Sequence, residues 1–411
     1  MRNTLSKNSL LPIFCCLALL TGCSEKTPKT GLEPGLEFSE SRACYGYEEK
    51  CVGVAADGRK LHSLSANGED VVIATSSDQG KSWKPETYDF PLPENNFFSY
   101  DWCSVTQGEN TLWVTGLSQG RPFVISSSNQ GQSWSGHVRK GKLEGGLSRA
   151  SANQNLLALL SLVNGLSVQG LLSSDGGKTW SQWESNFALP SNWSDWVLEP
   201  PRNSTYSQHL AVDAQDRVHL YLEDMEIKKE DKKKEGALHL RFSANGEFEW
   251  SEFLPEAGEV YAGDFARNSS LPNELYRVTS KDYKDKESVK EKTRYQVFMS
   301  ISRDSGDSWQ KPFMLFDNPS PIHALEVRAM GPLIVCSWAT RESRSDIDHL
   351  CYSKDGGKSW TSPQRVDLKR PSERRILTTT DGVYVVFPNR KTSHKSSKRL
   401  HLKYAPVEVT P

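Results

Sequence analysis

One eight-residue pattern recurs along this 411-residue chain and constrains its fold more than any other feature. The pattern reads Ser-x-Asp-x-Gly-x-Ser/Thr-Trp, and four complete copies begin at Ser76, Ser173, Ser302 and Ser353. A fifth copy starts at Ser127 and has Asn129 in place of the acid, and a sixth starts at Ser243 and has Glu247 in place of Gly. Successive tryptophans of the six copies are 46 to 70 residues apart, and a repeat unit of four strands needs about 40–50 residues. The spacing therefore predicts a repeat protein with one such unit in each interval.

The residue types of the pattern indicate a structural turn. Its Asp can accept hydrogen bonds from backbone N–H groups of the same turn, its Gly can adopt a positive φ, and its Trp can bury a large apolar surface. Copies in every unit lie at equivalent places around a ring and cannot converge on one site, so we expect neither catalysis nor metal binding from them. The residues assigned this structural role are Asp78, Trp83, Asn129, Trp134, Asp175, Trp180, Asp304, Trp309, Asp355 and Trp360.

These copies resemble the Asp boxes of the Asp-box, or BNR-repeat, β-propellers. That superfamily includes the sialidases, sortilin-type receptors and the propeller-type photosystem assembly factors. The resemblance covers roughly residues 37–408 and implies an all-β propeller in which each box joins the third strand of a blade to the fourth. It is specific for the fold and says little about the function.

The number of blades follows from the strands beyond the last box. Three further strand-like segments, 375–379, 383–387 and 400–404, have no box after them, so their blade lacks a fourth strand. A closed ring leaves no exposed sheet edge, and the segment Leu36–Ser41 can supply the missing strand. We predict seven blades of four antiparallel strands, with six as the alternative if the copy at Ser243 belongs to an insertion.

The amino-terminal residues predict export and a lipid anchor. Basic Arg2 and Lys7 precede an apolar stretch, and Leu-Thr-Gly-Cys ending at Cys23 looks like the lipobox of bacterial lipoproteins. The alternative is an ordinary cleaved signal with an incidental Cys. Ser24, rather than Asp, follows Cys23, which favours the outer membrane of a bacterial cell envelope. The expected organisation is a signal peptide over 1–23, a flexible tether over 24–36 and a single propeller domain over 37–408.

The composition of the chain gives no support for nucleic acid as a partner. The chain has 36% hydrophobic and 25% charged residues and a formal net charge of −1, so no basic excess points to nucleic acid. We expect a monomer that touches the membrane only through its lipid and needs no cofactor.

Five cysteines remain beyond the signal and the lipidated Cys23. Cys336 and Cys351 lie on two strand-like segments that can face each other across a hairpin, and they are the favoured disulfide. Cys44 with Cys51 is the second choice, and Cys103 then stays free. No Cys-x-x-Cys or cluster of His indicates a metal site.

Three charged stretches are expected as loops between second and third strands. They are Glu223–Gly236, Lys281–Arg294 and Asn389–Arg399. Because strands alternate in direction, these loops share a face with the blade-to-blade connections, and the boxes lie on the other face. Binding sites often use such variable loops, although mixed-sign runs also suit solvated hairpins without a function.

An enzymatic function finds little support in the motifs. Sialidases carry an Arg-Ile-Pro motif ahead of the first box, and none is present. A His-Glu-x-x-His pair and a phosphate-binding loop are also absent from the sequence. Other arginines, including Arg149, can still face the central channel from innermost strands. The candidate channel residues are Asp101, Asp264, Arg267, Glu326, Arg328 and Arg375.

The leading hypothesis is a non-enzymatic, lipid-anchored binding or assembly protein for a protein or glycan partner, and the alternative is a diverged sialidase-like glycoside hydrolase.

Overall fold

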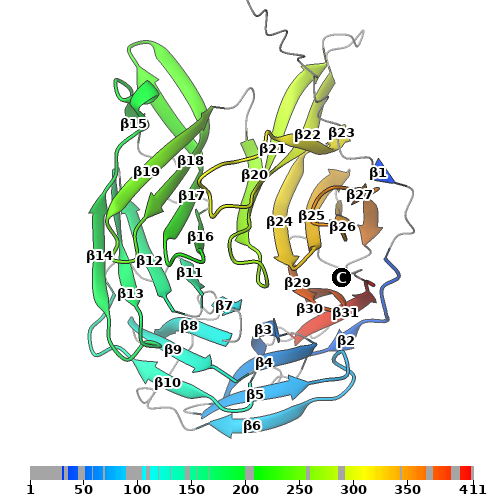
Figure 1. The fold of residues 1–411 in the computed structure, drawn as a ribbon. Coiled ribbons are helices and arrows are strands. Elements are labelled where there is room, and N and C mark those ends of the chain that lie inside the picture. The colour runs from blue at the N-terminus through cyan, green and yellow to red at the C-terminus, as the bar shows by residue number, and fades with distance from the viewer. Residues whose placement is uncertain are drawn as a thin grey trace, which may run out of the picture.

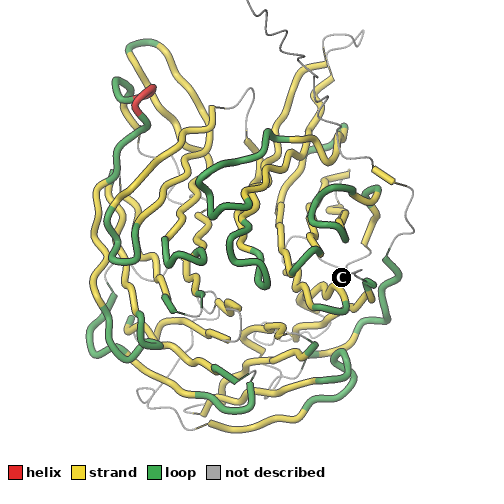
Figure 2. Tube along the Cα trace, viewed as in Figure 1, coloured by secondary structure: helices red, strands yellow, loops and turns green. Residues whose placement is uncertain are grey.

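The chain folds into a ring of seven four-stranded antiparallel sheets, a seven-bladed β-propeller (Figure 1). The structure is a computed structural model and describes residues 30–31, 36–44, 51–57, 59–67, 70–88, 104–107, 112–118, 120–129, 131–143, 149–153, 155–164, 166–199, 208–255, 260–285, 292–342, 345–366, 374–389 and 399–408. Nearly all of these residues are strand or turn (Figure 2), and one short 3-10 helix spans Ser191–Trp193. The predicted fold class and the number of seven blades are confirmed.

Each blade runs from an innermost to an outermost strand. Blade 1 consists of β3 (Cys51–Asp57), β4 (Lys60–Asn67), β5 (Asp70–Ser76) and β6 (Lys84–Tyr88). Blade 2 consists of β7 (Ser104–Gln107), β8 (Leu112–Ser118), β9 (Arg121–Ser127) and β10 (Ser135–Val138). Blade 3 consists of β11 (Arg149–Ala152), β12 (Leu157–Asn164), β13 (Ser167–Ser173) and β14 (Ser181–Asn186).

Blades 4 to 6 are larger. Blade 4 consists of β16 (Gln208–Val212), β17 (Val218–Lys229), β18 (Lys232–Phe242) and β19 (Phe248–Pro255), and β15 (Val197–Glu199) also pairs with β17. Blade 5 consists of β20 (Val260–Arg267), β21 (Leu275–Asp285), β22 (Lys292–Ser302) and β23 (Phe313–Asn318). Blade 6 consists of β24 (Ile322–Met330), β25 (Leu333–Glu342), β26 (Ser345–Ser353) and β28 (Gln364–Val366). Blade 7 has β29 (Arg375–Thr379), β30 (Gly382–Asn389) and β31 (Arg399–Pro406).

The amino-terminal segment closes the ring by completing blade 7. The strand β2 (Arg42–Ala43) pairs antiparallel with β31, and Ser39 N–H donates to Tyr404 O at 2.7 Å. This strand was predicted at Leu36–Ser41, a few residues too early. Leu36 and Phe38 instead pack against the apolar core that blades 6 and 7 share, which leaves the pairing to the residues that follow.

Two residues of the predicted tether also pair with the propeller. The short strand β1 (Thr30–Gly31) lies parallel to β27 (Trp360–Thr361) of blade 6. Residues 1–29, including Cys23, lie outside the described part of the chain. Among the residues that are described, none forms a helix of the length and hydropathy needed to cross a bilayer.

The repeated turns join the third strand of a blade to the fourth, as predicted. In the first copy, Gly80 N–H donates to Ser76 Oγ at 2.8 Å, and Ser82 donates to the Asp78 carboxylate through its amide at 2.9 Å and its hydroxyl at 2.6 Å. The hydroxyl and amide of Ser82 lower the pKa of Asp78 to about 2. In the Asn129 copy the last bond reverses, and Asn129 Nδ2 donates to Ser133 Oγ at 2.8 Å. The turn therefore tolerates the amide because the hydroxyl can accept as well as donate.

The glycine of each turn also contacts the preceding blade. A Cβ added at Gly80, Gly177, Gly306 or Gly357 would lie 2.6 to 2.9 Å from a side chain of the blade before it, all closer than packed atoms allow. The facing side chains are Leu402, Val124, His219 and Ile301. All four glycines have φ between +70° and +90°, so both the backbone and the available space require glycine. The repeated turn thus holds neighbouring blades together as well as closing a hairpin.

The turn tryptophans are less buried than the sequence analysis expected. Trp83, Trp134, Trp180 and Trp309 are partly exposed, and Trp360 is buried. The largest fully buried side chains are Trp183 and Trp338, which lie outside the pattern. The outer position of the third-to-fourth turn leaves one side of most of these rings open to solvent.

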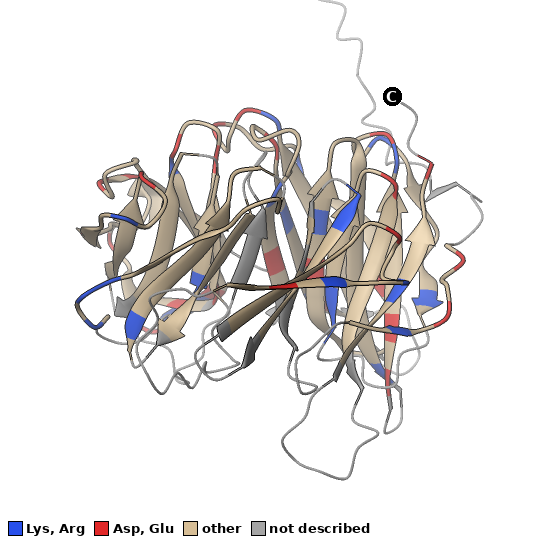
Figure 3. Cartoon of the chain, turned by 90° about the horizontal axis from the view of Figure 1, so that it is seen from below, with Lys and Arg blue, Asp and Glu red and all other residues tan. Residues whose placement is uncertain are grey.

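Most of the first charged stretch and the described ends of the second are strands rather than loops, which corrects the prediction. Residues 286–291 of the second stretch and 390–398 of the third lie outside the described residues. The β17–β18 ladder continues to Lys229 opposite Lys232, and the β21–β22 ladder continues to Asp285 opposite Lys292. Ion pairs between the strands, such as Lys233 Nζ with Glu226 at 2.6 Å, allow residues of both charges to stabilise an exposed pair of strands. Lys and Arg residues are interspersed with Asp and Glu residues along the described strands and turns (Figure 3).

Candidate functional site

The innermost strands of the seven blades line the axis of the ring. Each contacts the next all the way around, including β29 of blade 7 with β3 of blade 1 (Figure 1). All of them start from blade-to-blade connections, so their first residues lie at one end of the channel, here called the channel mouth. The repeated turns lie at the opposite face.

Five charged residues on three consecutive blades form one network near the channel mouth. We call it the channel cluster; its members are His209 (β16), Glu223 (β17), Asp264 (β20), Glu326 and Arg328 (both β24). Positive and negative groups alternate along it, which lets charges remain buried at a tolerable cost.

Asp264 is the centre of the channel cluster. Its Oδ2 accepts hydrogen bonds from Val327 N–H at 2.9 Å and Arg328 Nη1 at 2.8 Å, and its Oδ1 lies 2.7 Å from His209 Nδ1. Burial opposes ionisation, but the positive charges of Arg328 and His209 hold the pKa of Asp264 well below its ordinary value. Asp264 is therefore an ionised, fully bonded group that fixes its neighbours.

His209 lies between two carboxylates. Its Nδ1 faces Asp264, and its Nε2 lies 3.6 Å from Glu223 Oε1. Burial lowers the pKa of the imidazole, but Asp264 and then Glu223 more than offset burial and raise the pKa of His209 to about 9. His209 is thus an imidazolium at neutral pH.

Arg328 connects this network to blade 7. Its Nη2 lies 2.8 Å from Glu326 Oε1, and Glu326 Oε2 accepts a hydrogen bond from Ile376 N–H at 3.1 Å. The cluster consequently spans the innermost strands from β16 to β29.

Two exposed arginines lie beside the channel cluster. Arg149 and Arg375 are the first residues of β11 and β29, and Arg149 Nε donates to Gln208 O at 2.5 Å. Enclosure by the channel walls and then the positive charge of Arg375 lower the pKa of Arg149, and the charges of Asp264 and Glu223 oppose this. The positive charge of Arg375, on blade 7, therefore acts on Arg149, on blade 3, at the channel mouth.

The structure brings together most of the predicted channel residues. Asp264, Glu326 and Arg328 belong to the channel cluster, and Arg375 lies at its edge. Arg267 does not join it, because Arg267 is the last residue of β20 and its Nη2 donates to Ala152 O, at the far end of β11, at 3.4 Å. Asp101 lies outside the described residues.

Sequence reasoning missed His209 and Glu223. His209 lies at the start of an innermost strand, and the alternating direction of side chains along residues 208–212 could have indicated this position. Glu223 was assigned to a charged loop, but it is buried in β17 where the ladder shifts register between Leu222 and Met225. Such a bulge redirects a side chain and leaves no clear signal in the sequence.

A second buried ion pair lies between blades 6 and 7. Arg374 Nη1 is 2.8 Å from Asp348 Oδ1, and both side chains are almost fully buried. Burial raises the pKa of Asp348 to about 7, against the opposing charge of Arg374. Arg374 also donates to Ala324 O at 2.8 Å, so this pair ties innermost strands of neighbouring blades together.

Cys336 and Cys351 occupy directly opposed positions on β25 and β26, as the sequence analysis expected. Both are buried free thiols in the structure, and the disulfide proposed from the sequence is not formed there. Cys44 is also buried, whereas Cys103 lies outside the described residues and the side chain of Cys51 is not described.

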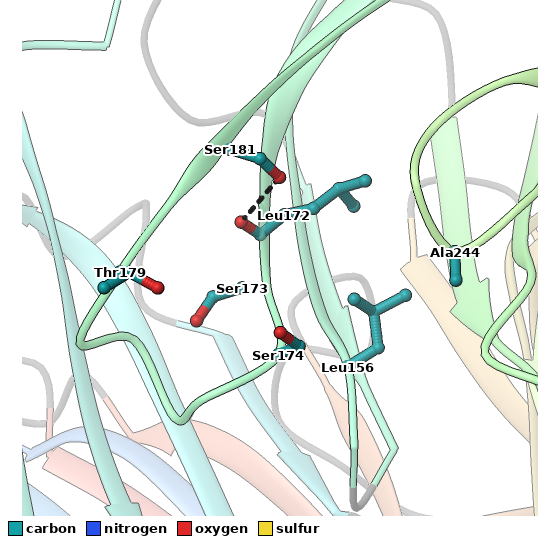
Figure 4. A pocket seen from close by; sticks show the side chains of 7 residues that line it. All are labelled: Leu156, Leu172, Ser173, Ser174, Thr179, Ser181 and Ala244. Atoms are coloured by element: carbon teal, nitrogen blue, oxygen red, sulfur yellow. Dashed lines mark hydrogen bonds between the residues drawn. The ribbon is translucent and has the colours of Figure 1, made fainter.

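A small pocket of about 140 Å³ lies between the repeated turns of blades 3 and 4, away from the channel cluster (Figure 4). It is lined by Leu156, Leu172, Ser173, Ser174, Thr179, Ser181 and Ala244. Its lining has hydroxyl groups but no charged side chain. No group of three or more His, Cys, Asp or Glu in the described part of the chain is placed to hold a metal ion.

Comparisons with known proteins give similarity at the level of the fold. No protein-family model matches the chain, and no curated protein matches it. A polysaccharide lyase of family PL25, an ulvan lyase bound to -[GlcA(1-4)Rha3S]-, is 9% identical with a TM-score of 0.49, covering 90% of this chain and 96% of that one. The α-L-arabinofuranosidase Arb93A from Fusarium graminearum is 13% identical with a TM-score of 0.42, covering 78% and 97%. NanB is 9% identical with a TM-score of 0.37, covering 90% and 83%.

Proposed function

We propose that this protein is a non-enzymatic, lipid-anchored binding protein that holds an anionic group of a glycan or protein partner at the channel mouth. The observation that carries the proposal is the pair Arg149 and Arg375, two exposed arginines at the channel mouth, where the charge of Arg375 acts on Arg149. An anion between them would relieve their mutual repulsion and accept charge-assisted hydrogen bonds from both.

The channel cluster supports binding better than hydrolysis. Asp264 is ionised and bonded to Val327, Arg328 and His209, so it has no proton to donate at neutral pH. Its role in this proposal is to hold the innermost strands β16, β20 and β24 in register beneath the anion site. A preorganised support of this kind improves binding because little order is lost when the ligand arrives.

Binding to acidic and neutral glycans tests the proposal. We expect the full chain to select acidic glycans on an array, and the variants Arg149→Gln and Arg375→Gln to weaken that binding by about tenfold each. Arg59→Gln is the matched control, because Arg59 is an exposed arginine on a turn of blade 1. Equal binding of neutral and acidic glycans would contradict the anion site. Turnover of a fluorogenic sialoside that both variants abolish would instead support the diverged glycoside hydrolase.

Membrane attachment is proposed from Cys23 and its lipobox-like context. Replacing Cys23 by Ser should release the protein from membranes, because acyl chains would be its membrane contact. Fractionation after a salt wash tests this. A Cys23→Ser protein that still sediments with membranes would show that the lipid anchor is wrong.

A further inference from the structure

Three buried polar atoms of the channel cluster have no hydrogen bond among the described residues; one of them, Glu326 Oε1, is ion-paired with Arg328 Nη2 at 2.8 Å, and the other two face each other. These two are His209 Nε2 and Glu223 Oε1. The 3.6 Å between them is longer than a hydrogen bond, and their side chains are 17% and 3% exposed. Buried polar atoms in folded proteins are nearly always hydrogen-bonded, and these two form an ion pair without a hydrogen bond.

The two atoms have complementary chemistry. The Nε2–H of an imidazolium is a donor only, and the oxygen of a carboxylate is an acceptor only. A hydroxyl group can satisfy both at once, because its oxygen accepts a hydrogen bond while its hydrogen is donated. A carboxylate or an ammonium group could satisfy only one of them.

Glycine 263 makes room for the acceptor. A Cβ at Gly263 would overlap Glu223 Oε1, although Gly263 has no positive φ that would require glycine for the backbone. Glycine at this place on β20 therefore allows the Glu223 carboxylate to approach His209. The register shift in β17 turns Glu223 toward the same place.

These atoms lie next to the proposed anion site. Arg149 donates to the carbonyl of Gln208, the residue before His209, and its pKa responds to the charges of Asp264 and Glu223. Arg149 and the His209–Glu223 pair are therefore close neighbours at the channel mouth.

We propose that His209 Nε2 and Glu223 Oε1 form a hydroxyl-binding subsite beside the anion site, so that the ligand is a hydroxy acid of the uronic acid type rather than a simple anion. This inference rests on the proposed function. A site built to bond a hydroxyl rejects an analogue that lacks it, because its own buried polar groups then stay unpaired.

Two small probes separate the subsite from the anion site. D-glucuronate and cyclohexanecarboxylate both carry one carboxylate on a six-membered ring, and only the first has hydroxyl groups. We expect the wild-type chain to bind glucuronate at least about tenfold more tightly in calorimetric titrations. Glu223→Leu removes the acceptor oxygen and should remove most of this preference, and its loss of a negative charge should not weaken the binding of cyclohexanecarboxylate.

A second variant separates loss of the subsite from misfolding of the protein. Gly263→Ala should displace the Glu223 carboxylate and remove the same preference without changing any polar group of the channel cluster, and melting temperatures report whether either variant is folded. Equal affinity of the wild type for the two acids would overturn the subsite and leave the anion site standing. No binding of either acid at millimolar concentration would overturn the anion site and the subsite together.

Discussion

Gly131 of the repeated turn in blade 2 lies directly against the imidazole of His62 in blade 1, so close that a Cβ at position 131 would overlap the ring. His62 is almost fully buried, and its Nδ1 is 3.0 Å from Thr75 Oγ1. The contact joins two blades through a glycine and a neutral histidine, and it leads to the first two predictions.

Gly131→Ala should destabilise the protein by roughly 3 kcal/mol or more, because the methyl group meets a buried ring and the residue also has a positive φ of 74°. Gly331→Ala is a matched control. Gly331 also has a positive φ, 58°, but nothing lies within 4 Å of a Cβ there, so only backbone strain of about 1–2 kcal/mol is expected. Chemical denaturation of both variants measures the difference. Equal losses would show that the contact with His62 carries no cost.

Stability should fall in acid through His62. Burial, helped by the charge of Lys60, lowers the pKa of His62 from 6.5 to about 4. The unfolded chain therefore binds a proton more readily, and the free energy of unfolding should decrease by about 2–3 kcal/mol as the pH falls from 6.5 to 4. A His62→Leu variant should show a shallower decline over this range in urea titrations. An identical slope in the two proteins would exclude His62 as the cause.

His209 should have the opposite effect in alkali. Its pKa is raised to about 9, so its contribution is complete below pH 6.5 and is lost as the pH rises through 9. We expect the free energy of unfolding to decrease by about 2–3 kcal/mol between pH 6.5 and 9. The variant His209→Gln should be less stable at pH 6.5 and should lack most of this decline. Equal pH dependence above 6.5 in wild type and variant would contradict the imidazolium assignment.

Trp338 should matter more to stability than the tryptophan of a repeated turn. Trp338 is fully buried and lies 4.8 Å from the Phe316 ring, centroid to centroid, so Trp338→Ala should cost about 3–5 kcal/mol. Trp180 is partly exposed, and Trp180→Ala should cost less, roughly 1–2 kcal/mol. Thermal unfolding of the two variants compares them directly, and an equal or larger loss for Trp180→Ala would show that the turn tryptophans carry the core.

The architecture could be predicted because it depends on local, repeated features. The Ser-x-Asp-x-Gly turn forms its hydrogen bonds within eight residues, so each copy marks the end of a third strand wherever it occurs. The three strands after residue 374 predicted a seventh blade because a closed ring needs a partner for every edge. The exact pairing was less predictable, since apolar packing of Leu36 and Phe38 moved the closing strand to Arg42–Ala43.

The channel cluster could be predicted only in part, for a physical reason. The sequence by itself determined which polar residues lie on innermost strands, and this identified Asp264, Glu326, Arg328 and Arg375. Only the tertiary structure decided that Asp264 bonds His209 from a neighbouring blade, and that a register shift and Gly263 bring Glu223 to the same place. These contacts join residues of different blades, so they depend on how the blades pack around the axis rather than on any local pattern.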